Sequence, residues 1–361
     1  ADIIAAATDP LAIQGGGTRG VQPAGVAIST AGLSGVELYE PGALTLVAQA
    51  GTPMAEIEAA LAAENQRLAF EPADMRAVLG TDRESTIGGV VACNASGPRR
   101  ISVGACRDFM LGVRFVAGSG AIVKNGGRVM KNVTGYDLVK LMSGAHGTLG
   151  VLSEVSLKVL PDVEMQICLR IEGLSAVQAV EAMSRALGSP FEVTGAARDL
   201  DGSVLLRLEG FEASVRYRAE QLTELLGRFG TIDIIDDQTT CASLWRDIRD
   251  ARGFAGSAGD LWRISVKPSD APRVLNAAPS SKALLDWGGG LIWLETPSGF
   301  DLREKMSVGG HATLMRASDA SFTALGRFHP EPAAITKLST ELRTRFDPKA
   351  LFNPGLMERV A

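Results

Sequence analysis

The sequence predicts an α+β fold with two domains, and three observations lead to this prediction. The chain has 361 residues, a length that favours two domains over one. It has 41 glycines, well above the average usage of about 7% of residues, and they are concentrated in the first 150 residues. After Pro161 longer strands and helices alternate instead, which indicates a second domain of a different style.

The first elements are short and are joined by glycine turns. Residues 11–13 form an apolar strand that runs into Gly15-Gly16-Gly17-Thr18. A strand over residues 44–48 precedes a helix over 53–65, with Thr52 as its N-cap and Pro53 at its first position. The spacing of Met54, Ile57 and Leu61 predicts the buried face of that helix.

A hairpin and a half-buried strand complete the first domain. Residues 111–117 and 121–124 flank Gly118-Ser119-Gly120, a pattern typical of a hairpin. Residues 151–160 alternate apolar and polar side chains and end at Pro161, which predicts a strand with one buried face.

The segment after Pro161 predicts strands over 167–171, 204–208, 262–266 and 290–294, and helices over 175–187 and 213–229. This alternation is typical of a ferredoxin-like α+β domain. No internal repeat is visible in the sequence. We expect domains at residues 1–165 and 166–330, with residues 331–361 returning to the first domain through a helix over 331–345.

Composition excludes several classes of protein. The net charge is −5, and no basic tract interrupts the balance of 36 Lys and Arg against 41 Asp and Glu, so nucleic acid is not an expected partner. No apolar run reaches the roughly 18 residues of a membrane span, and the opening ADIIAAATDP is typical of the end of a helix and not of a signal peptide. The scattered Cys93, Cys106, Cys168 and Cys241 indicate a reducing cytoplasm and no iron–sulfur cluster on this chain.

Three glycine-rich turns suggest a bound phosphate-containing ligand. Gly15-Gly16-Gly17-Thr18 offers several unshielded N–H groups, which bind phosphate oxygens, although a plain turn explains the motif equally well on its own. Residues 86–97 (TIGGVVACNASG) combine glycine, hydroxyl and amide groups with almost no bulk, and residues 144–150 (GAHGTLG) enter a strand. The spacing is not that of a Rossmann fold.

These turns, together with RVMKNVTGYDL at residues 128–138 and FDPKALFNPGLM at residues 346–357, resemble the vanillyl-alcohol-oxidase (PCMH-type) family of FAD-binding proteins. Within it the sequence is most similar to the FAD-binding E subunits of bacterial glycolate oxidases. The resemblance implies a two-lobed PCMH-type FAD-binding domain with a ferredoxin-like cap. It also implies FAD as the cofactor. No histidine precedes His146, so the covalent histidyl link of some members is missing and we expect non-covalent binding.

The resemblance also implies which residues hold FAD. Gly15 to Thr18 would hold the pyrophosphate, and Asn353 would reach the isoalloxazine ring. The backbone at Gly150, Val151 and Leu152 would face the flavin or the adenine. The rest of the cofactor would be lined by Thr86, Gly88, Gly89, Asn94, Ser96, Gly97, Gly104 and Asp108.

Candidate catalytic residues come from one strand. Arg263, Ser265 and Lys267 alternate along residues 262–267, so all three could face a cleft, where Arg263 and Lys267 would bind a substrate carboxylate. A solvated strand face is the alternative. Related dehydrogenases carry paired histidines that bind a metal, but here His311 and His329 stand without convincing partners, so we expect no metal site.

The resemblance implies a glycolate oxidase subunit that oxidises glycolate to glyoxylate. It would work with a sister FAD subunit and an iron–sulfur subunit in the cytoplasm, associating with a membrane only through those partners. Two alternatives stay open: a self-sufficient D-2-hydroxy-acid (D-lactate) dehydrogenase, and a non-catalytic electron-transfer or assembly flavoprotein. A flavin reductase of the cell-wall precursor type lacks an evident catalytic motif here and ranks last.

Overall fold

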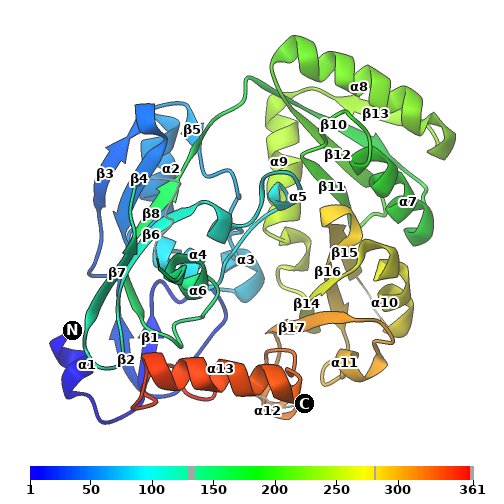
Figure 1. Ribbon diagram of the computed structural model, residues 1–361. Helices are drawn as coiled ribbons and strands as arrows, with labels where there is room; N and C mark the ends of the chain where they lie inside the picture. The colour runs from blue at the N-terminus through cyan, green and yellow to red at the C-terminus, as the bar shows by residue number, and fades with distance from the viewer. Residues whose placement is uncertain (129–134, 280–281, 358–361) are drawn as a thin grey trace.

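The computed structural model describes residues 1–128, 135–279 and 282–357. Two α+β domains lie side by side, one around a five-stranded sheet and one around an eight-stranded sheet (Figure 1). This confirms the predicted fold class.

The main sheet of the first domain is antiparallel, in the order β3-β4-β8-β6-β7. Its strands are β3 (Val36–Glu40), β4 (Thr45–Gln49), β6 (Met110–Val116), β7 (Ile122–Gly126) and β8 (Val151–Lys158). Two small pairs lie beside it: β1 (Leu11–Gln14) with β2 (Val26–Ser29), and β5 (Gln66–Arg67) with β9 (Leu160–Pro161). The helices of this domain are α1 (Asp2–Ala6), α2 (Met54–Ala62), α3 (Arg76–Leu79), α4 (Ile87–Ala92), α5 (Arg100–Val103) and α6 (Leu138–Met142).

Most predicted elements of this domain are present. The β6–β7 hairpin and the half-buried strand β8 are confirmed, as is the buried stripe of Met54, Ile57 and Leu61 on α2. The predicted start of α2 is wrong: Pro53, not Thr52, is its N-cap. The Thr52 hydroxyl instead donates to the carbonyl of Gln49 at 2.7 Å, so it fixes the preceding turn.

The second domain contains a structural repeat. Its first unit is β10 (Met165–Ile171), α7 (Ala176–Leu187), β11 (Gly195–Arg198), β12 (Val204–Gly210), α8 (Glu212–Leu226) and β13 (Ile232–Ile235). After α9 (Gln238–Arg249), the second unit is β14 (Asp260–Val266), α10 (Ala271–Ala277), β15 (Lys282–Asp286), β16 (Leu291–Thr296), α11 (Leu302–Lys305) and β17 (Gly310–Arg316). A short helix, α12 (Asp319–Leu325), follows.

Each unit has the βαββαβ order and the strand arrangement of a ferredoxin-like fold, and β11 joins β15 to make one sheet of order β13-β10-β12-β11-β15-β16-β14-β17. The expectation of no internal repeat is therefore wrong at the level of structure. The reason is that the two units share topology and not residue pattern.

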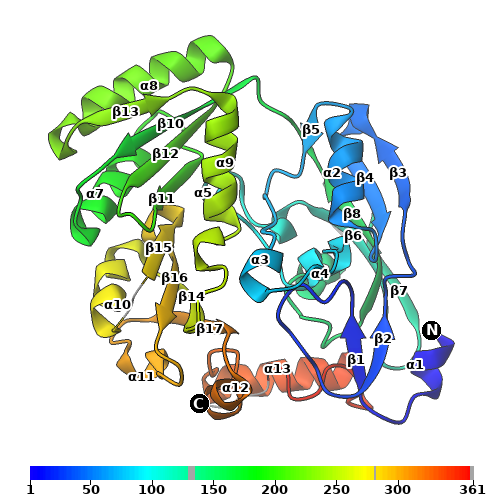
Figure 2. The ribbon, with the colours of Figure 1, turned by 180° about the vertical axis from the view of Figure 1, so that it is seen from behind.

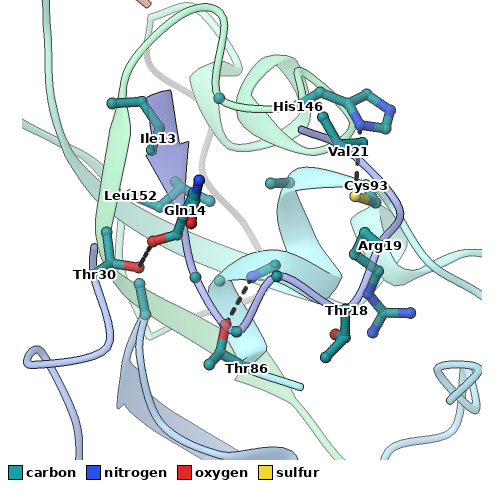
Figure 3. Close-up of a pocket in the computed structure, with 18 of the residues that line it drawn as sticks. Ile13, Gln14, Thr18, Arg19, Val21, Thr30, Thr86, Cys93, His146 and Leu152 are labelled. Atoms are coloured by element: carbon teal, nitrogen blue, oxygen red, sulfur yellow. Dashed lines mark hydrogen bonds between the residues drawn. The ribbon is translucent and has the colours of Figure 1, made fainter. Parts of the chain in front are cut away.

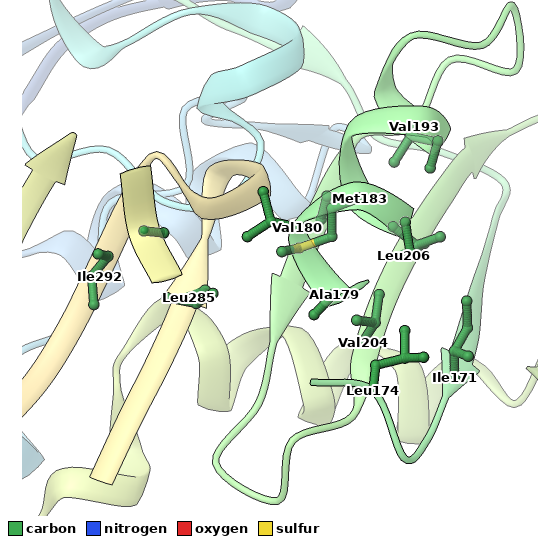
Figure 4. Packing of buried hydrophobic residues seen from close by; sticks show 14 of the residues in the cluster. Ile171, Leu174, Ala179, Val180, Met183, Val193, Val204, Leu206, Leu285 and Ile292 are labelled. Atoms are coloured by element: carbon green, nitrogen blue, oxygen red, sulfur yellow. The ribbon is translucent and has the colours of Figure 1, made fainter. Parts of the chain in front are cut away.

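The two faces of this sheet have different partners. Apolar residues on one face pack under α7, α8, α10 and α11, as Figure 4 shows for Val180 and Met183 of α7 against Leu206 of β12. The other face packs against α9 and against Val78 of α3 from the first domain. Both views place α9 on the side of the sheet that faces the first domain (Figures 1 and 2).

Strand alternation decides which polar side chains face the first domain. Trp262 and Ile264 of β14 belong to the helix-covered face, so Arg263 between them points the other way. Leu285 of β15 also belongs to the helix-covered face, so Asp286 points with Arg263 toward the first domain.

Buried ion pairs join the two domains. Arg99 of the first domain contacts Glu209 of β12 at 2.8 Å, and Arg207 of β12 contacts Glu71 of the first domain at 2.9 Å. Burial alone would raise the pKa of Glu71, but Arg207 and Arg99 hold that pKa below its usual value. These four residues, with Arg67, form what we call the interdomain network.

The end of the chain returns to the first domain. The helix α13 (Ala333–Phe346) crosses beneath both domains in Figure 1, and the Leu11 N–H then donates to the carbonyl of Leu351 at 2.7 Å. In the part of the chain that the structure describes, no helix is long and apolar enough to cross a membrane.

Candidate functional site

The first cavity lies between the β1–β2 turn, the start of α4 and the turn before β8 (Figure 3). We call it the glycine cavity. Its lining includes Gly15, Gly16, Gly17, Thr18, Thr30, Thr86, Gly88, Gly89, Gly147, Gly150, Leu152 and Asn353.

The turn at Gly15-Gly16-Gly17-Thr18 leaves its backbone donors free. None of these four N–H groups donates a hydrogen bond to another of the described residues. A run of free backbone donors beside a cavity fits a bound anion. The Thr18 side chain is buried beside them.

Two glycines show how closely backbone must approach here. A Cβ atom on Gly16 would lie 1.6 Å from the carbonyl oxygen of Glu84, so the turn itself requires glycine. A Cβ atom on Gly89 would meet only the Thr86 hydroxyl, at 3.4 Å, so the remaining space over Gly89 belongs to the cavity. The fold itself has room for a Cβ at Gly89. The glycine therefore leaves space for a ligand.

Asn353 brings the end of the chain to this cavity. Its side chain accepts a hydrogen bond from the Ile13 N–H at 2.7 Å and donates one to the carbonyl of His146 at 2.9 Å. Both ends of the amide are therefore used to hold β1 against the turn that precedes β8.

A second cavity opens from the first, between the two domains. Arg19, Val21, Cys93 and His146 line both, so they mark the junction. Its volume is about 240 Å³, which suits a small organic acid. We call it the arginine cavity, and its charged lining residues are Arg19, Arg100, Arg249, Arg263, Asp286 and Arg327.

Two of these arginines make neither an ion pair nor a side-chain hydrogen bond with the described residues. Arg263 and Arg100 make no ion pair there, and their guanidinium carbons lie 5.2 Å and 4.5 Å from the ring centroid of Trp287. Burial and the like charge of Arg100 lower the pKa of Arg263 to about 10. Several guanidinium groups around a cavity with a single carboxyl group among its described lining residues suit an anionic ligand.

At the junction a thiol meets an imidazole. Cys93 Sγ lies 3.5 Å from His146 Nδ1, and His146 has a left-handed backbone with φ of 50°. Burial opposes ionisation of the thiol, but His146, Arg19 and Arg327 together bring the pKa of Cys93 below its usual value.

The structure brings most of the predicted residues to these cavities. Gly15 to Thr18, Thr86, Gly88, Gly89, Gly150, Leu152 and Asn353 line the glycine cavity, and Asn94, Ser96, Gly97 and Arg263 line the arginine cavity.

Four predicted residues lie elsewhere. Gly104 and Asp108 shape a turn, in which the Asp108 carboxylate accepts from the Ala105 N–H at 2.9 Å. Val151 packs in a small core with Leu11 and Phe352. Lys267 is exposed beyond the end of β14, because the strand ends at Val266, so the prediction that it shares a cleft with Arg263 is wrong. Residues 129–134, the centre of the RVMKNVTGYDL motif, lie outside the described residues.

The histidines are closer than the sequence suggests. The rings of His311 and His329 stand 5.6 Å apart, and His329 Nδ1 accepts from the Ala312 N–H at 3.3 Å. Among the described residues, no group of three or more metal-binding side chains occurs.

Sequence reasoning misses Arg19, Arg100, Arg327 and Asp286, and it leaves the role of His146 open. Arg19 and Arg100 have a local signal, since each lies close after one of the glycine-containing loops. Arg327 and Asp286 have none, because they reach the cavity only through pairing in the eight-stranded sheet and the turn after it.

Comparison with known proteins agrees with this geometry. Residues 1–126 match the family model described as "FAD binding domain". The chain is 37% identical to glycolate oxidase subunit GlcE of Escherichia coli over 356 residues, which cover 96% of this chain and 92% of that protein. The chain belongs to the GlcE family of FAD-binding proteins. FAD is therefore its cofactor, and the predicted resemblance is confirmed.

More distant relatives share parts of the chain. The D-lactate dehydrogenase of Archaeoglobus fulgidus is 26% identical over 249 residues, covering 62% of this chain and 53% of that protein. A solved structure of alkyldihydroxyacetonephosphate synthase matches with a TM-score of 0.69 at 16% identity, covering 96% of this chain and 71% of that one. This last likeness shows the common fold only.

The glycine cavity fits FAD. The free N–H groups of Gly15 to Thr18 suit the pyrophosphate, and the open face of Gly89 admits a flat group that a side chain would exclude. Within this GlcE-family chain, the junction residues Cys93 and His146 stand where the glycine cavity meets the arginine cavity.

Proposed function

We propose that this chain is the FAD-binding subunit of a glycolate oxidase and that it binds a small 2-hydroxy carboxylate in the arginine cavity. The observation that supports the proposal is that the arginine cavity opens directly from the glycine cavity. Its described lining residues include five arginines and a single carboxyl group. The GlcE relative supports glycolate as the substrate and glyoxylate as the product.

The chain's own residues account for binding and orientation. Arg263 and Arg100 neutralise the substrate carboxylate, because they line the cavity and make no ion pair with the described residues. Trp287 and Trp293 flank Arg263 and limit where its guanidinium can lie. When bound, FAD would supply the acceptor for the hydride, a hydrogen with its two electrons, that leaves the hydroxyl-bearing carbon.

The electrons then leave through partners. A sister FAD subunit and an iron–sulfur subunit complete the proposed complex, which is supported by the GlcE relative's description as a subunit and by the dispersal of four free cysteines on this chain. The free thiols also support a cytoplasmic location, with any membrane association through the partners. The FAD link is proposed to be non-covalent, since the first loop carries no histidine.

A self-sufficient D-2-hydroxy-acid dehydrogenase is a second candidate, favoured by the completeness of the arginine cavity on one chain. The experiment that tests both is an anaerobic absorbance titration of the FAD-loaded chain with glycolate and then with D-lactate. Bleaching of the isolated chain by D-lactate in preference to glycolate would favour the second candidate. A flavin spectrum unmoved by glycolate, even in the assembled complex, would overturn the first.

The variant Arg263→Met tests the cavity itself. We expect the glycolate concentration for half-maximal bleaching to rise about 10-fold to 100-fold, since a hydrogen bond to a charged group contributes about 1.5–3 kcal/mol. Lys267 lies on the same segment but is exposed, so Lys267→Met should change the glycolate concentration for half-maximal bleaching by less than about twofold. Equal effects of the two substitutions would show that glycolate does not bind in the arginine cavity.

A further inference from the structure

The turn after β15 carries unusual backbone strain. Trp287, Gly288 and Gly289 have φ angles of 54°, 67° and 103°, three successive residues in the left-handed region. Glycine adopts this conformation freely, but a bulky tryptophan does not, and such strain persists only where the surrounding structure imposes it. The surroundings of the segment Asp286-Trp287-Gly288-Gly289-Gly290 therefore hold it in this conformation.

Trp287 fastens this turn to the first domain. Its indole N–H donates to the carbonyl of Gly97 at 3.0 Å, and Gly97 belongs to the loop that follows α4. The same ring contacts both Arg100 from the first domain and Arg263 from β14. The strained turn thus connects the FAD-binding domain with the side chains that make the arginine cavity cationic.

Asp286 is the residue that this turn presents to the cavity. Its side chain is only 2% exposed, and it is the single acid among the described residues that line the arginine cavity. One carboxylate oxygen, Oδ1, accepts from the Trp287 N–H at 2.7 Å, and Oδ2 has no hydrogen-bond partner among the described residues. A carboxylate oxygen without a hydrogen-bond partner among the described residues, in a cavity for a hydroxy acid, is placed to accept a proton.

We propose that Asp286 is the base that takes the hydroxyl proton of a 2-hydroxy acid bound in the arginine cavity, an assignment that rests on the proposed function. The O–H bond breaks and its proton goes to Oδ2 of Asp286. The C–H bond of the carbon that bears the hydroxyl group also breaks, and this hydrogen passes to FAD with its electron pair. The carbon–oxygen single bond thereby becomes a carbonyl. The cavity's arginines keep the substrate carboxylate apart from this reacting end.

The electrostatics of Asp286 suit this role. Burial is the largest influence and raises the pKa of Asp286 to about 7. The charge of Glu71 in the first domain also raises this pKa, whereas the Trp287 N–H and the charges of Arg207 and Arg263 lower it. The other charged or titratable groups that line the cavity with it are Arg19, Arg100 of α5, His146, Arg249 of α9 and Arg327. A base is most effective when its pKa lies near the working pH.

The test compares Asp286→Asn and Asp286→Glu with Asp199→Asn, a half-buried carboxylate outside the arginine cavity. Anaerobic flavin bleaching by glycolate is followed by stopped flow between pH 5.5 and 9, in the complex if the isolated chain is inactive. We expect Asp286→Asn to lower the rate about 100-fold to 10,000-fold and to lose the rise in rate around pH 7. Asp286→Glu should restore part of the rate, and Asp199→Asn should match the wild type.

A second measurement does not depend on turnover. Oxalate, an acid with no hydrogen to transfer, is titrated calorimetrically at pH 7 in two buffers of different ionisation enthalpy. Its negative charge should raise the pKa of Asp286, so the wild type should take up protons on binding and Asp286→Asn should take up none. Oxalate affinity should stay equal or increase in Asp286→Asn, because a negative charge has been removed.

The outcomes separate the two proposals. If the wild type is bleached by glycolate and Asp286→Asn is bleached within threefold of its rate, with an unchanged pH profile, the assignment of Asp286 is overturned while the proposed function stands. If the wild type is not bleached in the assembled complex, the proposed function fails. Proton uptake on oxalate binding that persists in Asp286→Asn would move the base to another group, His146 or Cys93, and overturn the assignment.

Discussion

The glycine cavity and the arginine cavity share a wall but are built by opposite means. The glycine cavity is made almost wholly by the first domain, from free backbone N–H groups and missing side chains. The arginine cavity is made by long charged side chains that reach in from both domains. This difference implies that FAD binding depends on one domain, whereas anion binding depends on how the two domains are held together.

A substitution in the interdomain network should separate anion binding from FAD binding most clearly. In Glu209→Gln, Arg99 and Arg207 lose a buried carboxylate that is 3% exposed at the side chain. Breaking a buried pair in this way costs about 3–5 kcal/mol. We expect chemical denaturation to show a loss of that size, and oxalate affinity to fall much more than FAD affinity. Glu212→Gln, which removes an exposed partner of Arg216, should change stability by less than about 0.5 kcal/mol.

The same network gives a pH dependence with a definite sign. The pKa values of Glu71 and Glu209 are held below the unfolded value of 4.5, because nearby arginines outweigh burial. The stabilisation is therefore present above about pH 4.5 and is lost as the pH falls below it. Glu209→Gln should flatten that acid limb, and an acid limb identical to the wild type would contradict the role of the network.

Gly89→Val tests the other cavity with little effect on the fold. The added Cβ meets only the Thr86 hydroxyl, so we expect the valine to weaken FAD binding by about 1–3 kcal/mol, roughly 5-fold to 150-fold. The flavin-to-protein absorbance ratio measures this, and circular dichroism checks folding. Gly309→Val, where no atom lies within 4 Å of an added Cβ, is the matched control. Full flavin content in Gly89→Val would show that FAD does not lie over α4.

The two cavities also differ in how far the sequence predicts them. The turns at Gly15 to Thr18 and at Thr86 to Gly89 are contiguous motifs, so the sequence alone indicates their role. Strand alternation is a local rule and identifies Arg263, but it wrongly joins Lys267 to it, because tertiary packing sets the end of β14. Asp286 escapes prediction because its position depends on β15 pairing with β11 and β16 and on a strained turn that no local pattern indicates.

Cys93 lies on the wall that the cavities share, and its reactivity should report on both. Burial raises the pKa values of Cys106, Cys168 and Cys241, that of Cys168 to about 12. These three thiols should therefore resist alkylation. Cys93 is only partly buried and has a lowered pKa beside His146. In the FAD-free chain, we expect iodoacetamide to modify Cys93 several-fold faster than the other three, as measured by peptide mass spectrometry.

The expected protection pattern then locates the cofactor. FAD should slow the modification of Cys93, and oxalate added to the FAD-loaded chain should slow it further, because one ligand covers the thiol from each cavity. His146→Gln should slow modification without either ligand, since the imidazole no longer favours the thiolate. If FAD left the rate unchanged while oxalate alone protected Cys93, the thiol would belong to the arginine cavity, and the flavin ring would have to end short of the junction.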